Sequence, residues 1–145
     1  MDQLPEELIR LKRFHGHLGP YVVVGYRMGQ LARQRLEGKL TAVAFTGTKT
    51  PLSCLVDGVQ FSSSCTLGKG NISIQDKGEA RAHFFNDRVL LDIKLDDEVK
   101  KSIDDGMSKE TEEATALAIY NEPEEELFEI TEVESELTER TLKLR

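Results

Sequence analysis

The sequence predicts an α+β domain, in which helices pack against one mixed or antiparallel sheet. Three observations support this fold class. The chain has 145 residues, of which 39% are hydrophobic and 31% charged, and this is the size and balance of one domain with a single core. Apolar residues recur at helical spacing in the first 38 residues. Short alternating segments, separated by turn-forming residues, follow between residues 72 and 95.

The first two elements are predicted to be helices. Leucines spaced at i, i+4 and i+7 define one face of a short helix over 4–14. A second helix is predicted over 20–38, because proline suits the first helical turn and glycine suits the residue after the last turn. Its first half, 21–26, is apolar on nearly every side and should be buried. Gly25 and Gly29 share one face, where another backbone can approach closely.

A strand and a third helix are predicted next. Residues 41–48 alternate in the manner of a strand. Thr50 and Pro51 are interpreted as the N-cap and the first residue of a helix that ends in the serine run 62–64. Residues 65–71 contain two glycines and are predicted to form a shaped loop.

Three strands and an acidic C-terminal part complete the chain. The strands are predicted over 72–75, 79–86 and 89–95, and their short connections favour an antiparallel meander. Two short helices should follow before Pro123, and alternation near 127–134 favours a last strand. The final ten residues are interpreted as frayed helix or strand.

Charge is distributed unevenly along this chain. One domain is expected over 1–145, with its motifs in a core over 8–95 and an acidic, helical extension over 96–145. The formal net charge is −7, yet residues 1–95 carry a net +4 and the extension a net −11. Such an acidic surface repels phosphate backbones, so nucleic acid is not expected as a partner. The extension is interpreted as a solvated face or, alternatively, as a surface that docks a partner.

Features of export, membrane insertion and disulfide bonding are all missing from the sequence. No stretch approaches the roughly 20 apolar residues of a membrane span, and the first residues lack the basic and apolar regions of an export signal. A cytoplasmic location without membrane contact is therefore expected. Two cysteines are too few for a disulfide framework, so both are expected to be reduced thiols.

Two histidines at the entrance to the second helix are the first candidates for chemistry. His15 and His17 can converge on one metal ion only if the backbone turns between them, and Gly16 supplies that freedom. The same helix entrance offers free N–H groups that can hold a carboxylate or an oxyanion. A purely structural interpretation makes one histidine a helix cap and the other a surface residue.

A cysteine and an aspartate form the second candidate group. Cys54 and Asp57 are three residues apart in the third helix, so their side chains can point into one pocket. Cys54 falls in the first turn, where the helix dipole is expected to lower the pKa of its thiol and favour the thiolate. The alternative for Cys54, and more so for Cys65, is a small buried thiol in the core.

Together these residues predict a mixed nitrogen and sulfur metal site. His17 and Cys54 would form its centre, and His15, Cys65 or Asp57 would complete the ligand shell. Imidazole and thiolate ligands favour a transition metal over magnesium or calcium, with zinc first and iron or nickel next. A different use of the same residues is cysteine catalysis, with Cys54 as nucleophile, His17 as acid and base, and Asp57 beside them.

The loop after the third helix adds candidate ligand-binding residues. Lys69 and Asn71 are candidates for cofactor binding, and Lys69 can neutralise a bound carboxylate or formyl oxygen. The plainer interpretation of Lys69 is a surface lysine. Residues 68–70 lack the order of a P-loop, so a nucleotide site of that kind is not expected. His83, in the middle predicted strand, is interpreted as structural.

Four windows occur in a characteristic order. They are His-Gly-His-Leu-Gly-Pro at 15–20, Gly-Tyr-Arg-Met-Gly at 25–29, Cys-Leu-Val-Asp-Gly-Val-Gln at 54–60 and Cys-Thr-Leu-Gly-Lys-Gly-Asn at 65–71. Over about 8–95 the chain resembles the FmdE family of formylmethanofuran dehydrogenase proteins, which is related to methanogenesis. The resemblance implies an α+β core like the C-terminal domain of glyceraldehyde-3-phosphate dehydrogenase. It also implies a pocket with a metal or redox role, often at a dimer interface.

The chain departs from the pattern of this family at two places. Gly19 stands where members usually have cysteine, which removes one potential thiolate from the pocket, and Tyr21 stands where a glycine commonly follows the proline. No cysteine follows Cys65, so the C-terminal zinc finger of many members is not expected here.

Three functions are compatible with these features. The first is a metal-binding, redox-associated protein that acts with a molybdenum or tungsten dehydrogenase complex, whose cofactor the partner would hold. The second is a stand-alone cysteine-dependent enzyme. The third is a non-catalytic interaction module, in which residues 123–145 dock a partner and can be removed without unfolding the core. A homodimer is expected, because a second copy could bury the apolar second helix.

Overall fold

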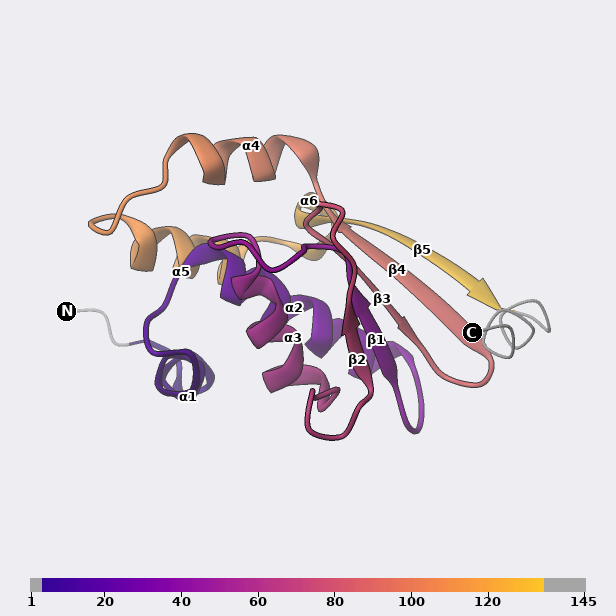
Figure 1. Ribbon diagram of the computed structural model, residues 1–145. Helices are drawn as coiled ribbons and strands as arrows, with labels where there is room; N and C mark the ends of the chain where they lie inside the picture. The colour runs from indigo at the N-terminus through magenta and orange to yellow at the C-terminus, as the bar shows by residue number, and fades with distance from the viewer. Residues whose placement is uncertain (1–3, 135–145) are drawn as a thin grey trace.

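The computed structural model describes residues 4–134, which form helices and a five-stranded sheet (Figure 1). In chain order the elements are α1 (Glu6–His15), α2 (Pro20–Arg35), β1 (Thr41–Ala44), α3 (Cys54–Ser63), β2 (Ile72–Ile74), β3 (Arg81–Phe85), β4 (Val89–Leu95), α4 (Asp97–Asp105), α5 (Glu112–Asn121), α6 (Glu124–Leu127) and β5 (Phe128–Glu134). The predicted α+β class is confirmed. Within the described residues, no helix has both the length and the apolar character that crossing a membrane requires.

The packing of α2 on α3 depends on glycine. A Cβ atom on Gly25 would lie 2.8 Å from the carbonyl carbon of Leu55 and closer still to its oxygen. The predicted close approach of another backbone to Gly25 is therefore confirmed, and that backbone is α3 of the same chain. Because α2 is covered within its own chain, its apolar character no longer calls for a second copy, and the homodimer stays a prediction.

The sheet has the strand order β2-β1-β3-β4-β5. β1 and β2 are parallel, and the other neighbouring strands are antiparallel. The predicted meander is correct for β3 and β4 but wrong for β2, which pairs with the far edge of β1. The reason is that α3 connects β1 to β2, and a crossover helix of this kind returns the chain as a parallel strand.

The start of α3 also differs from the prediction. Thr50 and Pro51 belong to a preceding turn, and Cys54 is the first residue of the helix. The N–H groups of Cys54 and Leu55 donate to the carbonyls of Pro51 and Leu52 at 3.1 Å. The first turn of α3 therefore has fewer free N–H groups than an ordinary helix start.

The acidic C-terminal extension is part of the fold. β5 pairs with β4 along its whole length, and Leu127 and Phe128 are buried in the core. The last strand expected near 127–134 is confirmed. The expectation that residues 123–145 can be removed without unfolding the core is wrong. Removal would expose these buried side chains and leave the edge of β4 that faces β5 without a partner. The final ten residues, interpreted as frayed helix or strand, lie outside the described residues.

Candidate metal centre

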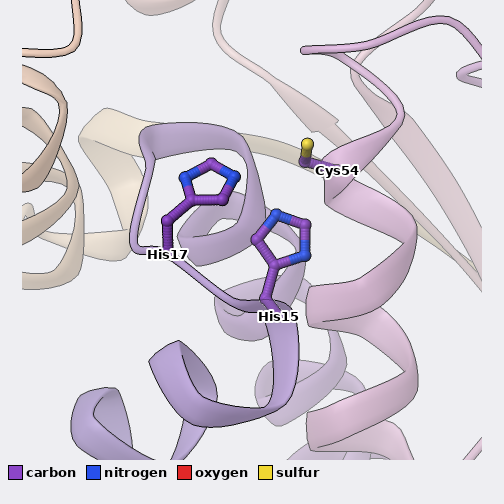
Figure 2. Close-up of side chains that lie close together, drawn as sticks. All are labelled: His15, His17 and Cys54. Carbon is purple, nitrogen blue, oxygen red and sulfur yellow. The ribbon is translucent and has the colours of Figure 1, made fainter.

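Three potential metal ligands meet at the N-terminal ends of α2 and α3. His15 ends α1, His17 lies in the connection to α2, and Cys54 begins α3. Figure 2 shows the three side chains close together. Their ligand atoms all lie within 4.8 Å of one another. Across residues 4–134 this is the one group of three or more such side chains at this spacing. The sequence windows that contain the histidines and Cys54 thus converge in space.

The turn between the two histidines depends on Gly16. It follows α1 with φ of +103°, a left-handed conformation, and its N–H donates to the carbonyl of Lys12 at 2.7 Å. The chain therefore changes direction directly after His15, and the two imidazole centroids lie 4.7 Å apart. Buried Leu18 then anchors the chain before Pro20 begins α2.

His15 is oriented by a carboxylate. Its side chain is only 9% exposed, and its Nδ1 lies 2.6 Å from Oδ2 of Asp57, one turn along α3 from Cys54. Its Nε2 is buried and has no hydrogen-bond partner among the described residues. Metal-binding histidines commonly bond a carboxylate through one ring nitrogen and the metal through the other. The Nε2 atom of His15 therefore fits a metal ligand, since a buried nitrogen without a partner is otherwise unfavourable.

His17 has a similar partner from a distant part of the chain. Its Nδ1 lies 3.3 Å from Oε1 of Glu112, the first residue of α5. The His17 side chain is 52% exposed, whereas that of Glu112 is 26% exposed. Glu112 was missed at the level of sequence because it is one of many acidic residues in a segment interpreted as a solvated face. No local pattern distinguishes it from the adjacent Glu113.

The Cys54 thiol differs from the sequence prediction. Burial raises its pKa, and the nearby carboxylates of Asp57 and Glu112 raise it further. The predicted effect of the helix dipole does not prevail, because the first N–H groups of α3 are already bonded within the preceding turn. In the metal-free protein Cys54 is therefore a thiol at neutral pH. A bound cation would reverse this preference, since a coordinated thiol loses its proton.

The spacing of the three side chains is compatible with a small metal ion. Zinc binds nitrogen at about 2.0 Å and sulfur at about 2.3 Å, which places tetrahedral ligands roughly 3.5 Å apart. The present separations of up to 4.8 Å would have to shorten by about 1 Å. His17, the most exposed of the three, has the freedom for this movement. Three protein ligands would leave one coordination position open.

A cavity of about 290 Å³ adjoins the three ligands. Part of its wall is apolar and comes from Pro20, Val22, Pro51 and Met107. Lys109 in the connection from α4 to α5 and Glu112 at the start of α5 contribute further lining. The C-terminal part of the chain therefore builds one side of the site that the N-terminal motifs begin.

Gly19 faces the same space. A Cβ atom at this position would lie 3.4 Å from Oε1 of Glu112 and 3.7 Å from Cε1 of His17. A cysteine here, which the family resemblance led us to expect, would direct its sulfur into the region of these two side chains. In this chain position 19 has no side chain, and the Glu112 carboxylate borders the space that a cysteine side chain would enter.

Tyr21 connects the pocket to α4. Its hydroxyl donates to Oδ1 of Asp104 at 2.5 Å. Burial is the main cause that raises the pKa of Tyr21, and the Asp104 carboxylate adds to it. Tyr21 is therefore a neutral hydrogen-bond donor that ties the start of α2 to α4.

Cys65 lies outside the metal cluster. It is fully buried, and its Sγ donates to the carbonyl of Leu40 at 3.4 Å. Burial raises the pKa of its thiol. This environment is that of the small buried thiol, which was the alternative interpretation of Cys65 from the sequence.

Three other predicted residues also lie away from the cluster. Lys69 and Asn71 line a second cavity, near the C-terminal ends of α2 and α3. His83 lies on β3, where its Nε2 is 3.2 Å from Asp92 and its ring packs edge-on against Phe45. The structure therefore brings together His15, His17, Cys54 and Asp57, but not Cys65, Lys69 or Asn71.

Comparison with known proteins gives a family match over most of the chain. The family model described as "FmdE, Molybdenum formylmethanofuran dehydrogenase operon" matches residues 14–138. This range begins at the histidine window and continues through α5, so it extends well beyond the 8–95 expected from the motifs.

Two individual proteins are also similar to this chain. A probable S-adenosyl-L-methionine-binding protein of Archaeoglobus fulgidus is 37% identical over 83 residues, which are 54% of this chain and 23% of that protein. The chain thus spans about a quarter of the length of this relative. The crystal structure of a tungsten formylmethanofuran dehydrogenase FmdE-like protein from Syntrophus aciditrophicus has the same fold, with a TM-score of 0.69 and 23% identity. That match covers 90% of this chain and 71% of the other.

Proposed function

Since the chain belongs to the FmdE family, associated with the molybdenum formylmethanofuran dehydrogenase operon, we propose that it is a metal-binding protein with a redox-associated role. The metal we propose is zinc, with iron or nickel as the other candidates, held by His15, His17 and Cys54. The main support for this proposal is the convergence of these three side chains, together with the buried Nε2 of His15, which has no hydrogen-bond partner among the described residues.

Each residue of the site has a defined task in this proposal. In this proposal Nδ1–H of His15 donates a hydrogen bond to the Asp57 carboxylate, which leaves Nε2 free to bind the metal. The Glu112 carboxylate, 3.3 Å from Nδ1 of His17, would orient that ring electrostatically from α5. Cys54 gives up its proton on binding and supplies the one negative charge among the three ligands. The bound ion would supply Lewis-acid or redox chemistry at its open position.

The apolar walls of the cavity define how a ligand would reach that position. Pro20, Pro51 and Met107 limit the water around the site, which strengthens electrostatic interactions inside it. A ligand in the cavity would meet the open coordination position, with Lys109 among the residues around it. We place this activity in association with a molybdenum or tungsten dehydrogenase, as the operon name of the family suggests. A homodimer is part of the same proposal.

Cysteine catalysis is less well supported than metal binding. A nucleophilic cysteine needs a low thiol pKa and a base nearby. Here burial and two carboxylates raise the pKa of Cys54, and the nitrogen of His17 next to Glu112 is already engaged. The same surroundings favour a metal ion, because a cation is attracted by the two carboxylates.

The test compares metal content in matched variants purified without an affinity tag. The wild type is expected to hold close to one equivalent of metal, or to bind one equivalent of added Co²⁺ with a thiolate-to-cobalt charge-transfer band. Cys54→Ala and His17→Ala should lose most of the metal and the band. Cys65→Ala is the matched control, because the second cysteine lies outside the cluster, and it should retain both.

Two outcomes would overturn the proposal. One is negligible binding of zinc, iron, nickel and cobalt by the folded wild type. The other is an equal loss of metal in Cys65→Ala and Cys54→Ala at equal thermal stability, because this would show that the cluster is not the site.

A further inference from the structure

The window over 65–71 takes no part in the metal centre, although it is one of the most distinctive stretches of the sequence. It borders a separate cavity of about 470 Å³ near the C-terminal ends of α2 and α3. We refer to this space as the basic cavity and define it by Arg33, Lys39, Ser64, Lys69 and Asn71. The metal centre lies at the N-terminal ends of the same two helices.

The basic cavity gathers positive charge without counter-ions. None of the described residues that line it is acidic. Within residues 4–134, Arg33, Lys39 and Lys69 form no ion pair with an acidic side chain. The charges of Lys69 and Arg33 also both act on the buried Cys65 thiol, opposing the effect of burial on its pKa. Two of the cations therefore lie near one point, although they are 36 positions apart in sequence.

The loop that carries Lys69 is held in place by hydrogen bonds. Oδ1 of Asn71 accepts from the N–H of Thr66 at 2.8 Å, and Nδ2 of Asn71 donates to the carbonyl of Leu40 at 3.2 Å. The N–H of Lys69 donates to the carbonyl of Thr66 at 3.2 Å. The backbone on both sides of Lys69 is thus organised before any ligand binds, which lowers the entropy cost of binding.

We propose that the basic cavity binds the phosphate or diphosphate group of a small molecule. A multiply charged oxyanion matches three separate cations better than a single carboxylate does, and arginine presents paired donors that fit phosphate oxygens. Ser64 and Thr41 add hydroxyl groups to the lining. The volume exceeds that of one phosphate ion, so a larger ligand can place its charged group here. Long polyanions such as nucleic acid are disfavoured by the net charge of −7.

The test is a titration of the full chain with inorganic pyrophosphate. Calorimetry measures the binding, and NMR measures the backbone amide chemical shifts of residues 63–71. We expect saturable binding that shifts these signals and weakens with added salt. Inorganic phosphate should bind more weakly than pyrophosphate, because it carries less charge. The same titration is made with adenosine diphosphate and with adenosine. We expect adenosine diphosphate to bind and adenosine not to bind, because the phosphates provide the affinity.

Variants of two loop lysines make the test specific. Lys69→Gln and Lys39→Gln should each weaken pyrophosphate binding about tenfold. Both lie outside helices, whereas Arg33 is in the last turn of α2, where its charge also favours the helix. Arg33 is therefore replaced only by lysine. Lys77→Gln is the matched control, because Lys77 forms no ion pair within the described chain and lies outside the basic cavity, and it should change affinity less than about twofold.

Three results would overturn the proposal. They are the absence of saturable pyrophosphate binding by the folded wild type, an equal loss in Lys77→Gln and Lys69→Gln, and amide shifts confined to other parts of the chain. The Cys54→Ala variant separates this site from the metal centre. It should bind pyrophosphate as the wild type does, whatever its metal content.

Discussion

Two carboxylates decide which nitrogen each imidazole of the metal centre can offer. Asp57 bonds Nδ1 of His15, and Glu112 lies beside Nδ1 of His17. Asp57 was recognised from its spacing to Cys54, because both lie on one helix. Glu112 reaches the site only through the docking of α5 on α2, and no neighbouring residue in the sequence marks it.

Replacement of Glu112 tests this orienting role. Glu112→Gln removes the charge that favours the Nδ1-protonated form of His17, so we expect metal affinity to fall about tenfold or more. The measurement is competition for Co²⁺ against a chelator, with the cobalt spectrum as a second readout of ligand geometry. Glu113→Gln is the control, because Glu113 pairs with Lys12 at 2.8 Å on the outside of the site. Equal effects of the two changes would contradict the orienting role.

The acidity of Cys54 gives a second prediction at this scale. Because burial and the carboxylates of Asp57 and Glu112 raise its pKa, alkylation of the metal-free protein by iodoacetamide should be slow at neutral pH. Its rate should rise with a midpoint above the ordinary thiol value of about 8.5. Asp57→Asn removes one negative charge and should move the midpoint down. A midpoint below about 8.5 in the wild type would restore the nucleophile hypothesis.

At the scale of elements, the contact between α2 and α3 positions both halves of the metal centre. α2 follows the histidine turn directly, and Cys54 begins α3. The two helices approach closely because Gly25 has no side chain where the backbone of Leu55 lies. A change at this contact should therefore affect stability and the site together.

Substitution of Gly25 tests the contact. Gly25→Ala would place a Cβ atom against the backbone of α3, which cannot rotate away as a side chain can, so we expect a loss of about 3 kcal/mol in the free energy of unfolding. Denaturant unfolding measures it. Gly68→Ala is the control, because a Cβ atom there would meet nothing within 4 Å, and its effect should stay within about 0.5 kcal/mol. Similar stabilities of the two variants would refute this account of the helix contact.

At the scale of the whole molecule, the acidic part of the chain folds onto the basic part. Lys12 pairs with Glu113, Arg35 pairs with Glu124, and Arg27 donates to the carbonyls of Ile119 and Glu122. These contacts join α1 and α2 to α5, to α6 and to the residues between them. The excess of acidic residues beyond position 95 is therefore used partly inside the chain, rather than only as a solvated face.

Metal binding should stabilise this whole arrangement, because the three ligands come from the end of α1, the connection to α2 and the start of α3. At a free zinc concentration about one hundred times the Kd, the gain is about 2.7 kcal/mol. For a chain of this size, we expect the Tm to rise by roughly 10 °C. Differential scanning calorimetry with zinc and with a chelator measures the shift, and Cys54→Ala is the control that should lose it. An equal shift in that variant would place the zinc elsewhere.

Local sequence patterns were sufficient to predict most helices and strands in their order, although not α6, and the two windows whose side chains converge at the candidate metal centre. The leucine spacing of α1, the apolar run of α2 and the Gly16 turn each act within a few residues, so they can be recognised without knowing the fold. His15, His17 and Cys54 were recognised as candidate ligands for the same reason. The pKa of Cys54 was not predictable, because it depends on charges from two different elements.

Only the tertiary structure decided which distant segments meet. β2 pairs beyond β1 because α3 crosses over the sheet, and Glu112 reaches His17 because α5 docks on α2. The same long-range packing separates Lys69 and Asn71 from the metal cluster and places them beside Arg33. Strand pairing and helix docking depend on contacts between residues far apart in the chain, and such contacts leave no local periodicity from which they could be read.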